Sequence, residues 1–528
     1  MTPFALYILF FLSGVSGLGY EILWTRMLSV GLGHEIVSVL AVVSAFFSGI
    51  ALGAWLLDRP VSRSNTPGRW FALLEAAIGL WALALLFILP ELNTVVSGWI
   101  GVDPTPARHW VVSFCYPFSV LLPATMAMGG TLPAMDRFAE QHNGERQSVG
   151  GLYSTNTFGA AAGTLAVTFL LLPQLGMNRT SLILVSVNTI CTVGALLLAR
   201  VSTASGKPKE LPGRAGIPRR GMLLLMTGLA GIGFEVLMVR VLSQVFENTV
   251  FSFASMLMVF LFGTAAGAAV YQKHRRSLSP DGGLSCLLLA SAFFCLASIF
   301  LLQYAEPLFH ALQEIFGDGM HAAVLAELSL ALLFFLLPTA SMGATFSHLA
   351  QSLRGPEGGV GRALCLNTLG GAFAPALFGV LLLSRLGITH ALVLIPAAYV
   401  LCLPHFRRGT AAISALLAGL AVLIVQHAGP HPFVSLGEGE MMVHHREGVM
   451  ASVSVVKDRQ GGLHLKVNNR YQMGGSTSMF SDRRQAYLPL LLHPAPQSAL
   501  FLGLGTGATF AAAADFPELS AVGGGVIP

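Results

Sequence analysis

The sequence predicts an all-α polytopic membrane protein of two parallel six-helix repeats, followed by a thirteenth span and a small α/β domain. The first observation is composition: of 528 residues, 54% are hydrophobic and only 10% are charged, with a mean hydropathy of +0.70. Soluble domains carry about a quarter of charged residues, so the chain is predicted to lie in a membrane. The second observation is an internal repeat, and the third is a return to polar composition from about His431 onward.

The repeat is clearest at residues 13–26, SGVSGLGYEILWTR, which recur at residues 227–240 as TGLAGIGFEVLMVR. At this constant offset, five residues of the first copy fall on identical residues of the second: Gly14, Gly17, Gly19, Glu21 and Arg26 on Gly228, Gly231, Gly233, Glu235 and Arg240. After a short deletion, Asn156 meets Asn367 and Gly176 meets Gly387. A repeat that keeps register this long dictates the architecture of about the first four hundred residues.

Six apolar runs in each copy are long enough for a bilayer crossing, which takes about 20 residues. The first copy has spans near 4–25, 36–57, 70–90, 109–130, 149–172 and 180–199, and the second near 221–241, 249–271, 283–303, 321–341, 361–383 and 388–404. Because each copy has an even number of spans, both copies run the same way through the membrane. Residues 411–426 are long enough for a thirteenth span. Residues 53–59, GAWLLDR, resemble the loop after the second span of major facilitator transporters.

The loops predict the orientation. Those after even-numbered spans hold 18 basic residues, against 5 on the other side. The positive-inside rule then predicts a cytoplasmic amino terminus and linker, and the cell (inner) membrane is the expected location. Thirteen spans place the last domain on the outer side, whereas a segment 411–426 that does not cross keeps it inside, and the sequence leaves both open.

Several classes of site are not expected. The six cysteines lie singly in apolar segments without a CxxC, so neither a disulfide framework nor a metal site is indicated. The net charge of +5 comes from basic residues in short loops, and no nucleic-acid motif is present, so the expected partner is the lipid bilayer. No tightly bound cofactor is expected.

Two repeated pairs of ionisable residues are the sharpest candidates in the membrane region: Glu21 with Arg26, and Glu235 with Arg240. Ionisable groups in spans are costly and usually face a cavity or a partner. Five positions correspond to about 500° of helix rotation, so neither pair stacks on one helix face. One hypothesis pairs Glu21 with Arg240 and Glu235 with Arg26 across the pseudo-twofold axis. The alternative is that these residues anchor the outer helix ends at the membrane interface.

Three further polar residues lie in the predicted spans. Asn156 and Asn367 recur in an NTxG motif, whose small residues suit close helix packing, so they join helices or contact a substrate. Glu75 has no counterpart in the second copy and is expected near the membrane interface.

From about His431 the pattern changes to that of a small α/β domain. The stretches ASVSVVKD and GLHLKVNN alternate at period two and predict a β-hairpin with the turn RQGG. A helical stretch, DRRQAYLPLLLHP, precedes the strand ALFLGLG, a glycine turn, a helix start and a second strand, SAVGGGVIP. This is one hairpin and the first βα unit of a dinucleotide-type sheet, which normally has more strands.

Residues 493–507, HPAPQSALFLGLGTG, follow a hairpin that ends in LKVNNRYQ and resemble the spermidine synthase (polyamine aminopropyltransferase) family. The whole chain resembles membrane-embedded fusions of a transporter-like region with a C-terminally truncated domain of that family. The resemblance implies that Gly503, Gly505 and Gly507 hold decarboxylated S-adenosylmethionine as co-substrate, and that Gln472 lies at the same site.

The chain departs from the family pattern at several positions. Asn468 and Asn469 replace an Asp-Gly, Thr506 replaces an aspartate, and Gly525 replaces the ribose-binding acid. The catalytic aspartate of the family has no counterpart in these 528 residues and is expected beyond the carboxyl terminus, so no catalytic residue is assigned.

Two functions follow as hypotheses, together with a third in which the chain performs neither. The resemblance implies a membrane-anchored aminopropyltransferase that acts on a polyamine such as putrescine, while the repeat favours a carrier for polyamines or another small solute. The predicted domains are the repeats 1–201 and 221–408, the linker 202–220, the thirteenth span 409–430 and the spermidine synthase-like domain 431–528.

Overall fold

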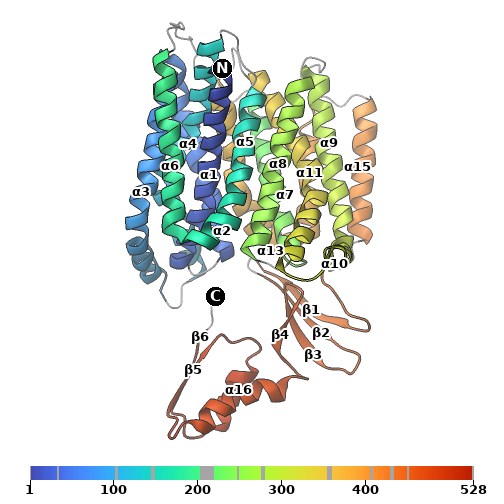
Figure 1. Ribbon diagram of the computed structural model, residues 1–528. Coiled ribbons are helices and arrows are strands. Elements are labelled where there is room, and N and C mark those ends of the chain that lie inside the picture. Colours follow the sequence, from blue (N-terminus) through green and yellow to red (C-terminus); the bar gives the residue numbers. More distant parts are fainter. Residues whose placement is uncertain are drawn as a thin grey trace. The chain divides into compact units, whose positions relative to one another are not determined.

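The structure, a computed structural model, describes residues 2–32, 35–101, 105–143, 149–201, 219–246, 249–274, 280–353, 359–404, 408–427, 433–448 and 451–525. The chain forms two compact units, Met1–His427 and Ala428–Pro528. The first unit is a bundle of long helices and the second is a small α/β unit (Figure 1). The predicted fold class, a helical polytopic membrane protein with a small C-terminal α/β region, is confirmed.

The first half of the helical unit has six long helical segments. They are α1 (Thr2–Leu32), α2 (Glu35–Arg63), α3 (Pro67–Ile100), α4 (Pro106–Asn143), α5 (Val149–Leu165) with the π-helix η1 (Ala166–Leu171), and α6 (Leu172–Val201). The second half repeats them as α7 (Arg219–Leu242), α8 (Val250–His274), α9 (Pro280–Leu301), α11 (Met320–Leu353), α12 (Val360–Ala374) with the π-helix η4 (Pro375–Leu382) and α13 (Leu383–Leu386), and α14 (Ile388–Leu401).

Eleven helical segments among the described residues are long and apolar enough to cross a membrane. One of them, of 52 residues, covers α5 and α6 together and so holds two of the predicted spans. The helix α14 is shorter. The last helix, α15 (Arg408–His427), has the length and hydropathy of the thirteenth span that the sequence predicts.

Repeated glycines mark places where helices meet backbone to backbone. A Cβ atom on Gly14 of α1 would lie 2.0 Å from the carbonyl oxygen of Asn156 on α5. In the second half, a Cβ atom on Gly228 would lie 2.0 Å from the carbonyl oxygen of Asn367 on α12. Only glycine fits at such crossings, which explains why these positions recur in both copies.

The fifth span of each half ends in the same unusual way. Both contain a π-helical stretch, η1 and η4, and π-helices are rare in proteins. Each is followed by a glycine with positive φ, Gly176 at 72° and Gly387 at 75°, where the chain turns into the next span. A side chain is strained in this backbone region, so the repeated glycines are required there.

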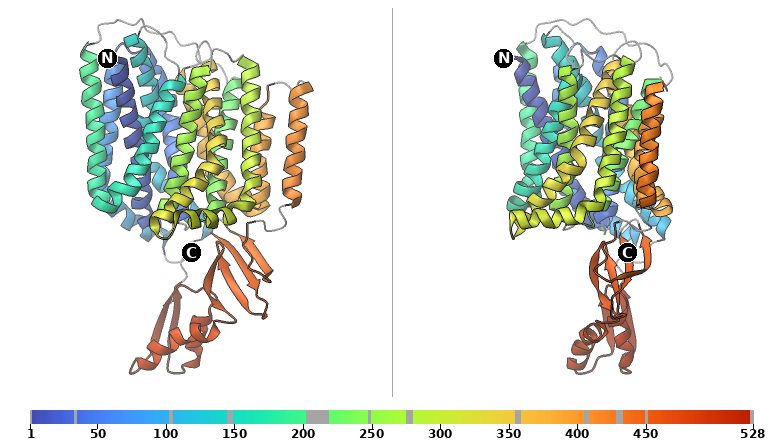
Figure 2. Two further views of the ribbon diagram at one scale, coloured as in Figure 1. Left: turned by 45° about the vertical axis from the view of Figure 1, so that its right-hand side comes forward. Right: turned by 90° about the vertical axis from the view of Figure 1, so that its right-hand side faces the viewer.

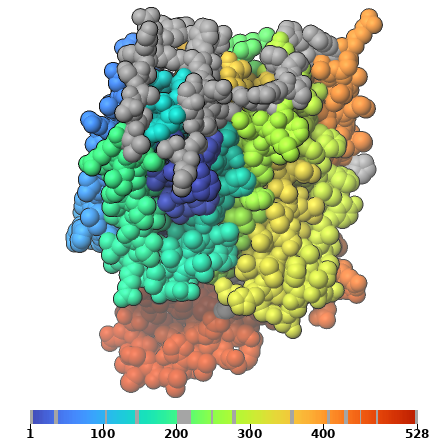
Figure 3. Space-filling model, turned by 45° about the horizontal axis from the view of Figure 1, so that its top comes forward, coloured from blue at the N-terminus to red at the C-terminus, as the bar shows by residue number. Residues whose placement is uncertain are grey.

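The two halves meet along two helix pairs, α2 with α12 and α5 with α8. Figure 3 shows the first half, blue to blue-green, beside the second, yellow-green to yellow. On α5, the hydroxyl of Ser154 donates to the carbonyl oxygen of Ala265 on α8 at 2.9 Å. On α2, Asp58 accepts a hydrogen bond from the backbone N–H of Gly361 at the start of α12, at 3.1 Å. These contacts form the seam between the halves.

Two helices lie outside the repeat. The amphipathic helix α10 (Ala305–Phe316) lies across one end of the bundle instead of along it (Figures 1 and 2). The helix α15 packs on α9 and α14 and runs the length of the bundle (Figure 2). It begins at the end of the bundle where the amino terminus lies and finishes at the other end, as the odd-numbered spans do (Figure 1).

The C-terminal unit contains a four-stranded antiparallel sheet in the order β1 (Met441–Glu447), β2 (Ser452–Lys457), β3 (Leu463–Val467), β4 (Arg470–Gly475). The predicted hairpin corresponds to β2 and β3, and β1 and β4 extend it on both sides. After α16 (Met479–Leu492), the strands β5 (Ser498–Leu502) and β6 (Ala521–Gly525) pair in parallel around α17 (Ala508–Ala511) and the 3-10 turn η5 (Ala512–Asp515).

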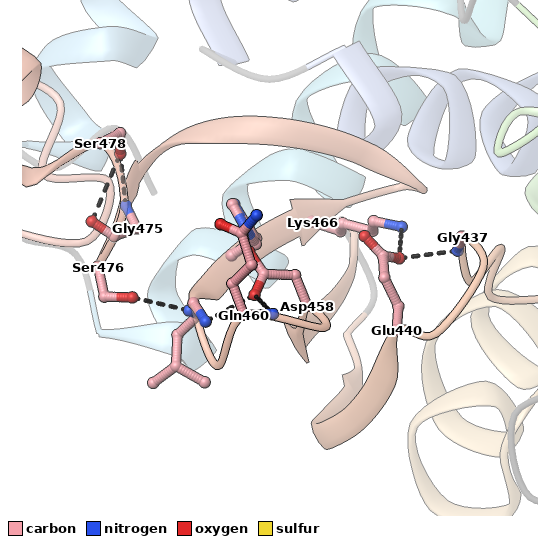
Figure 4. A network of polar contacts seen from close by, with 11 residues as sticks. Gly437, Glu440, Asp458, Gln460, Lys466, Gly475, Ser476 and Ser478 are labelled. Carbon is pink, nitrogen blue, oxygen red and sulfur yellow. Dashed lines mark hydrogen bonds and ion pairs between the residues drawn. The ribbon is translucent and has the colours of Figure 1, made fainter.

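Polar contacts hold the four-stranded sheet (Figure 4). Lys466 is almost fully buried and pairs with Glu440 at 2.8 Å, and Glu440 also accepts from the backbone N–H of Gly437. In the β2–β3 turn, Asp458 accepts from backbone N–H groups of the turn, and its side-chain hydrogen bond with His464 holds its pKa below the ordinary value.

Candidate functional site

A cavity of about 250 Å³ lies inside the helical unit, and residues of both halves line it. Its walls come mainly from α1, α2, α4 and α5 of the first half and from α7, α8, α11 and α12 of the second. Many lining residues occupy corresponding positions of the two copies, as Gly17 and Gly231 do. Transporters of two parallel six-helix halves bind their substrates at this interface.

Glu21 and Glu235, the repeated glutamates of the predicted membrane site, both line this cavity. They lie on α1 and α7. Neither has an ion-pair partner among the described residues, so the hypothesis of pairing with Arg240 and Arg26 across the axis is wrong for this structure. The arginines do not line the cavity, and Arg240 is buried.

Asn156 and Asn367 also line the cavity. The amide of Asn156 donates to the carbonyl oxygen of Phe10 at 3.0 Å, so it joins α5 to α1 as well. Two tyrosines that the sequence does not single out, Tyr153 on α5 and Tyr399 on α14, line the same cavity. Their sequence neighbourhoods are ordinary apolar spans, and only the fold brings them to the site.

Aromatic rings form much of the remaining cavity surface. Besides the tyrosines they are Phe10, Phe46, Phe47, Phe253, Phe260 and Phe346. The face of an aromatic ring attracts cations, and the attraction increases where water is excluded. The cavity therefore combines two carboxyl groups with aromatic faces, and none of its lining residues in the described part of the chain is basic.

A second polar cluster lies directly behind the cavity wall. Glu75 on α3 is fully buried, and it accepts hydrogen bonds from the hydroxyl of Ser13 at 2.5 Å and from the amide of Asn188 at 2.7 Å. The helices of the bundle therefore enclose Glu75, which an interfacial position by itself does not predict. The hydropathy pattern locates the span, but it does not show that Asn188, more than a hundred residues away, faces this carboxyl group.

In the C-terminal unit, the glycine turn has the backbone that its sequence predicts. Gly503, Gly505 and Gly507 all have positive φ, at 88°, 54° and 81°. Gly503 and Gly505 line a pocket of about 770 Å³ together with residues of α16 and β5. Gly507 precedes α17, which is only four residues long. The turn can thus approach a ligand closely with its backbone.

The strand β4 reaches this glycine turn, because a Cβ atom on Gly474 would lie 1.8 Å from the hydroxyl oxygen of Thr506. Gln472 lies two residues earlier on β4, and its side chain falls outside the described residues. The strand β6 ends in glycines, so in the described part of the chain the turn and β6 supply no carboxylate for a ribose. The residues fit a close backbone approach but not the full adenosyl group of decarboxylated S-adenosylmethionine.

One face of the β5–β6 sheet is open. Phe501 packs with α16, while Leu500 and Leu502 on the other face are 71% and 84% exposed.

Within the described residues, no group of three His, Cys, Asp or Glu side chains could hold a metal ion.

No protein-family model matches the chain. Over 238 residues it is 26% identical to polyamine aminopropyltransferase 2 of Streptomyces coelicolor, a match that covers 45% of this chain and 39% of that protein. The chain therefore spans well under half of the length of this curated relative.

Among solved structures, the chain is similar to a bacterial homologue of the iron transporter ferroportin in its outward-facing state, with a TM-score of 0.48, 14% identity, and coverage of 81% of this chain and 100% of that chain. It is also similar to the E. coli Major Facilitator Superfamily transporter FucP in the outward conformation, with a TM-score of 0.45, 15% identity, and coverage of 80% and 98%. These similarities concern the arrangement of helices alone. The chain is a multi-pass membrane protein with a distant, partial sequence similarity to polyamine aminopropyltransferases.

Proposed function

We propose that the chain is a carrier that moves a small organic cation of the polyamine class across the membrane. The observation that carries the proposal is the placement of Glu21 and Glu235 in one cavity between the two halves. Among the residues that the structure describes, no basic side chain lines this cavity, so a cationic substrate would supply the missing charge. Buried carboxylates without a cation are costly in free energy. A cationic substrate that neutralises them removes this cost, and the gain contributes to its binding.

The chemistry of the lining favours an amine over other cations. Carboxylates accept hydrogen bonds from ammonium groups, and the phenylalanine and tyrosine faces stabilise a positive charge on an alkyl chain. Glu21 and Glu235 occupy equivalent positions of the two copies, so they offer similar surroundings to the two ends of a diamine. A hard metal ion would instead prefer several oxygen ligands and no rings.

The carrier mechanism follows from the two halves. In parallel-repeat carriers the halves rock about a central site and expose it alternately to the two sides. The seam residues Asp58, near the carboxyl-terminal end of α2, and Gly361, at the start of α12, would separate when the cavity opens at that end. The substrate would remain bound between α1 and α7 during this change.

The test is uptake of radiolabelled putrescine and spermidine into liposomes that contain the full chain. We expect saturable uptake. Unlabelled polyamines should inhibit it, and a neutral sugar should not. The double variant E21Q/E235Q should lose it while remaining monodisperse in detergent. Equal uptake by the wild type and the double variant would contradict the proposal.

The orientation is part of this proposal. The basic loops support a cytoplasmic amino terminus, and the helix α15 then delivers the chain to the outer side after His427. Cysteine labelling from outside intact cells, at a residue introduced in the linker 202–220 and at one in the C-terminal unit, would check both. The linker should be protected and the C-terminal unit labelled.

A second candidate function is aminopropyl transfer by the C-terminal unit. The observation in its favour is the glycine turn, whose three positive φ values and adjoining pocket suit a ligand. Release of methylthioadenosine from decarboxylated S-adenosylmethionine and putrescine would support it. The absence of such release, together with saturable polyamine uptake, would leave the carrier as the function.

A further inference from the structure

Glu75 is an ionisable group that the carrier proposal does not use. Its side chain is 0% exposed, and it lies on α3 among α1, α4 and α6. No basic side chain of the described residues is paired with it. A carboxylate in such a place is costly unless it is hydrogen-bonded or takes up a cation, of which the smallest is a proton.

The hydrogen bonds around Glu75 fit either protonation state. Its two oxygens contact the hydroxyl of Ser13 and the amide of Asn188. The oxygen of that amide accepts a hydrogen bond from the hydroxyl of Tyr20 at 2.8 Å, and its nitrogen also contacts the hydroxyl of Ser16 at 3.1 Å. A serine hydroxyl can donate to a carboxylate or accept from a carboxylic acid, so the contact survives gain and loss of a proton.

The other groups near Glu75 do not supply a positive charge. From α1, Tyr20 donates a hydrogen bond to Asn188, the partner of Glu75, and on α6 Cys191 lies one turn after Asn188. Neither group carries a positive charge. In the described part of the chain, no side chain of α4 forms a hydrogen bond or an ion pair with Glu75. Protonation is therefore the available means of neutralising Glu75.

A short path joins this carboxyl group to the cavity. Ser13 and Ser16 line the cavity on their side of α1, and both belong to the hydrogen-bond network of Glu75. One hydroxyl group, that of Ser13, thus separates the buried carboxyl group from the space proposed for the substrate.

The second half of the bundle lacks this network. At the positions that correspond to Glu75, Asn188 and Tyr20 it has Leu289, Tyr399 and Phe234. All three are buried hydrophobic or aromatic residues. The six-helix unit therefore packs without the carboxyl group, and packing alone does not account for its presence in the first half.

We propose that Glu75 binds the proton that the carrier exchanges for its cationic substrate. This inference rests on the proposed function. When the cation enters the cavity, the O–H bond of the Glu75 carboxylic acid breaks, and the proton leaves by way of the Ser13 hydroxyl to water in the cavity. When the cation has left, a proton from the other side restores the acid.

The direction of coupling follows from electrostatics. A carboxylate at Glu75 attracts a cation in the adjoining cavity, and a protonated Glu75 does not. By linkage, the bound cation weakens proton binding by the same factor, which gives exchange and not joint transport. Asn188 and Ser13 already occupy the carboxyl oxygens with donors, so a metal ion such as sodium lacks the several free oxygens it needs.

The test uses the full chain in liposomes that contain a pH-sensitive dye, with radiolabelled putrescine outside. An acidic interior is expected to drive putrescine above the level reached without a pH gradient, and the internal pH should rise as protons leave. The variant E75Q cannot carry a proton, so it should lose this accumulation while still exchanging external labelled for internal unlabelled putrescine. The variant E75D keeps a carboxyl group and should restore part of the coupling.

A matched control is E327Q. Glu327 on α11 is buried, hydrogen-bonded to Ser252 at 2.7 Å, and not part of the cavity lining, so coupling should persist. If E75Q does not fold, the test is a measurement of proton release when putrescine is added to the wild-type protein in unbuffered detergent solution. Release of protons is the expected result.

The outcomes are distinct. Putrescine uptake without any proton movement, or accumulation driven by a sodium gradient alone, would overturn the assignment of Glu75 and leave the carrier proposal intact. An unchanged response in E75Q would do the same. The absence of polyamine uptake by the wild type would instead overturn the carrier proposal.

Discussion

The two halves of the helical unit share a fold but differ in what they bury. Both place a glutamate in the cavity, at Glu21 and Glu235, and both use the same glycine crossings. The first half buries a polar network around Glu75, where the second has Leu289, and the second half buries Glu327 beside Ser252 at a different position. The comparison teaches that the repeat supplies the bundle and the cavity, while the differences between copies supply the polar groups that a coupled carrier needs.

The largest effect is expected from the shared feature. Removing one cavity charge, in E21Q or in E235Q, should weaken polyamine binding by about 1.5–3 kcal/mol, the size of a hydrogen bond to a charged group. Equal losses from the two variants would show that the halves contribute equally to the site. Calorimetry of putrescine binding to the purified proteins measures both losses. A loss of affinity in only one of the two variants would show that the halves do not contribute equally.

The glycine crossings should respond alike in both halves. G14A and G228A place a Cβ atom against a carbonyl oxygen, and overpacking of this kind costs about 1–3 kcal/mol, here towards the upper end because the backbone cannot move aside. Thermal unfolding in detergent measures the effect. G17A is the control, since a Cβ atom there meets nothing within 4 Å and alanine favours a helix. A drop for G17A as large as for G14A would contradict the packing explanation.

The polar network should distinguish the halves. N188L removes the amide that serves Glu75, Ser16 and Tyr20, and leaving buried groups unsatisfied costs about 1–3 kcal/mol. The counterpart change Y399F removes a single long hydrogen bond of 3.5 Å and should cost about 0.5 kcal/mol, the lower end for a hydrogen bond. Comparison of the two unfolding temperatures checks this. Similar values for both would argue against a special role of the first half.

The smallest effect is expected at the seam. Asp58 places a carboxylate at the beginning of α12, and D58N keeps an acceptor but removes the charge, which costs about 0.3–1 kcal/mol at a helix amino terminus. Its counterpart in the second copy, Gln272, has a side-chain oxygen without a hydrogen-bond partner among the described residues, so Q272M should be neutral. A thermal shift assay compares them, and a larger loss for Q272M than for D58N would reverse the expected asymmetry.

Much of the fold could be predicted from the sequence, because hydropathy indicates the spans and the internal repeat indicates which helices correspond. The spans, the paired glycines and the hairpin β2–β3 are local patterns. The depth of Glu75 could not be predicted, since its partners come from α1 and α6. The strand β1 could not be predicted either, because its residues alternate only between exposed and half-buried.

The candidate site shows the same division. Glu21, Glu235, Asn156 and Asn367 could be picked out because they recur, and the structure brings them to one cavity. The predicted cross-pairing failed because repetition tells which residues are equivalent and not which way they point. Tyr399, which has no identical counterpart in the first copy, could be placed only from the helix arrangement.

The glycine crossings have a mechanical consequence. Within each half, helices touch through backbone atoms, which have no rotamers with which to adapt, so sliding one against the other meets immediate overlap. Across the seam the close ring contacts are between side chains, such as Phe158 with Phe262 and Tyr153 with Phe346, and these can reorient. Each six-helix half is therefore stiff, and large-scale motion is confined to the hinge-like surface between them.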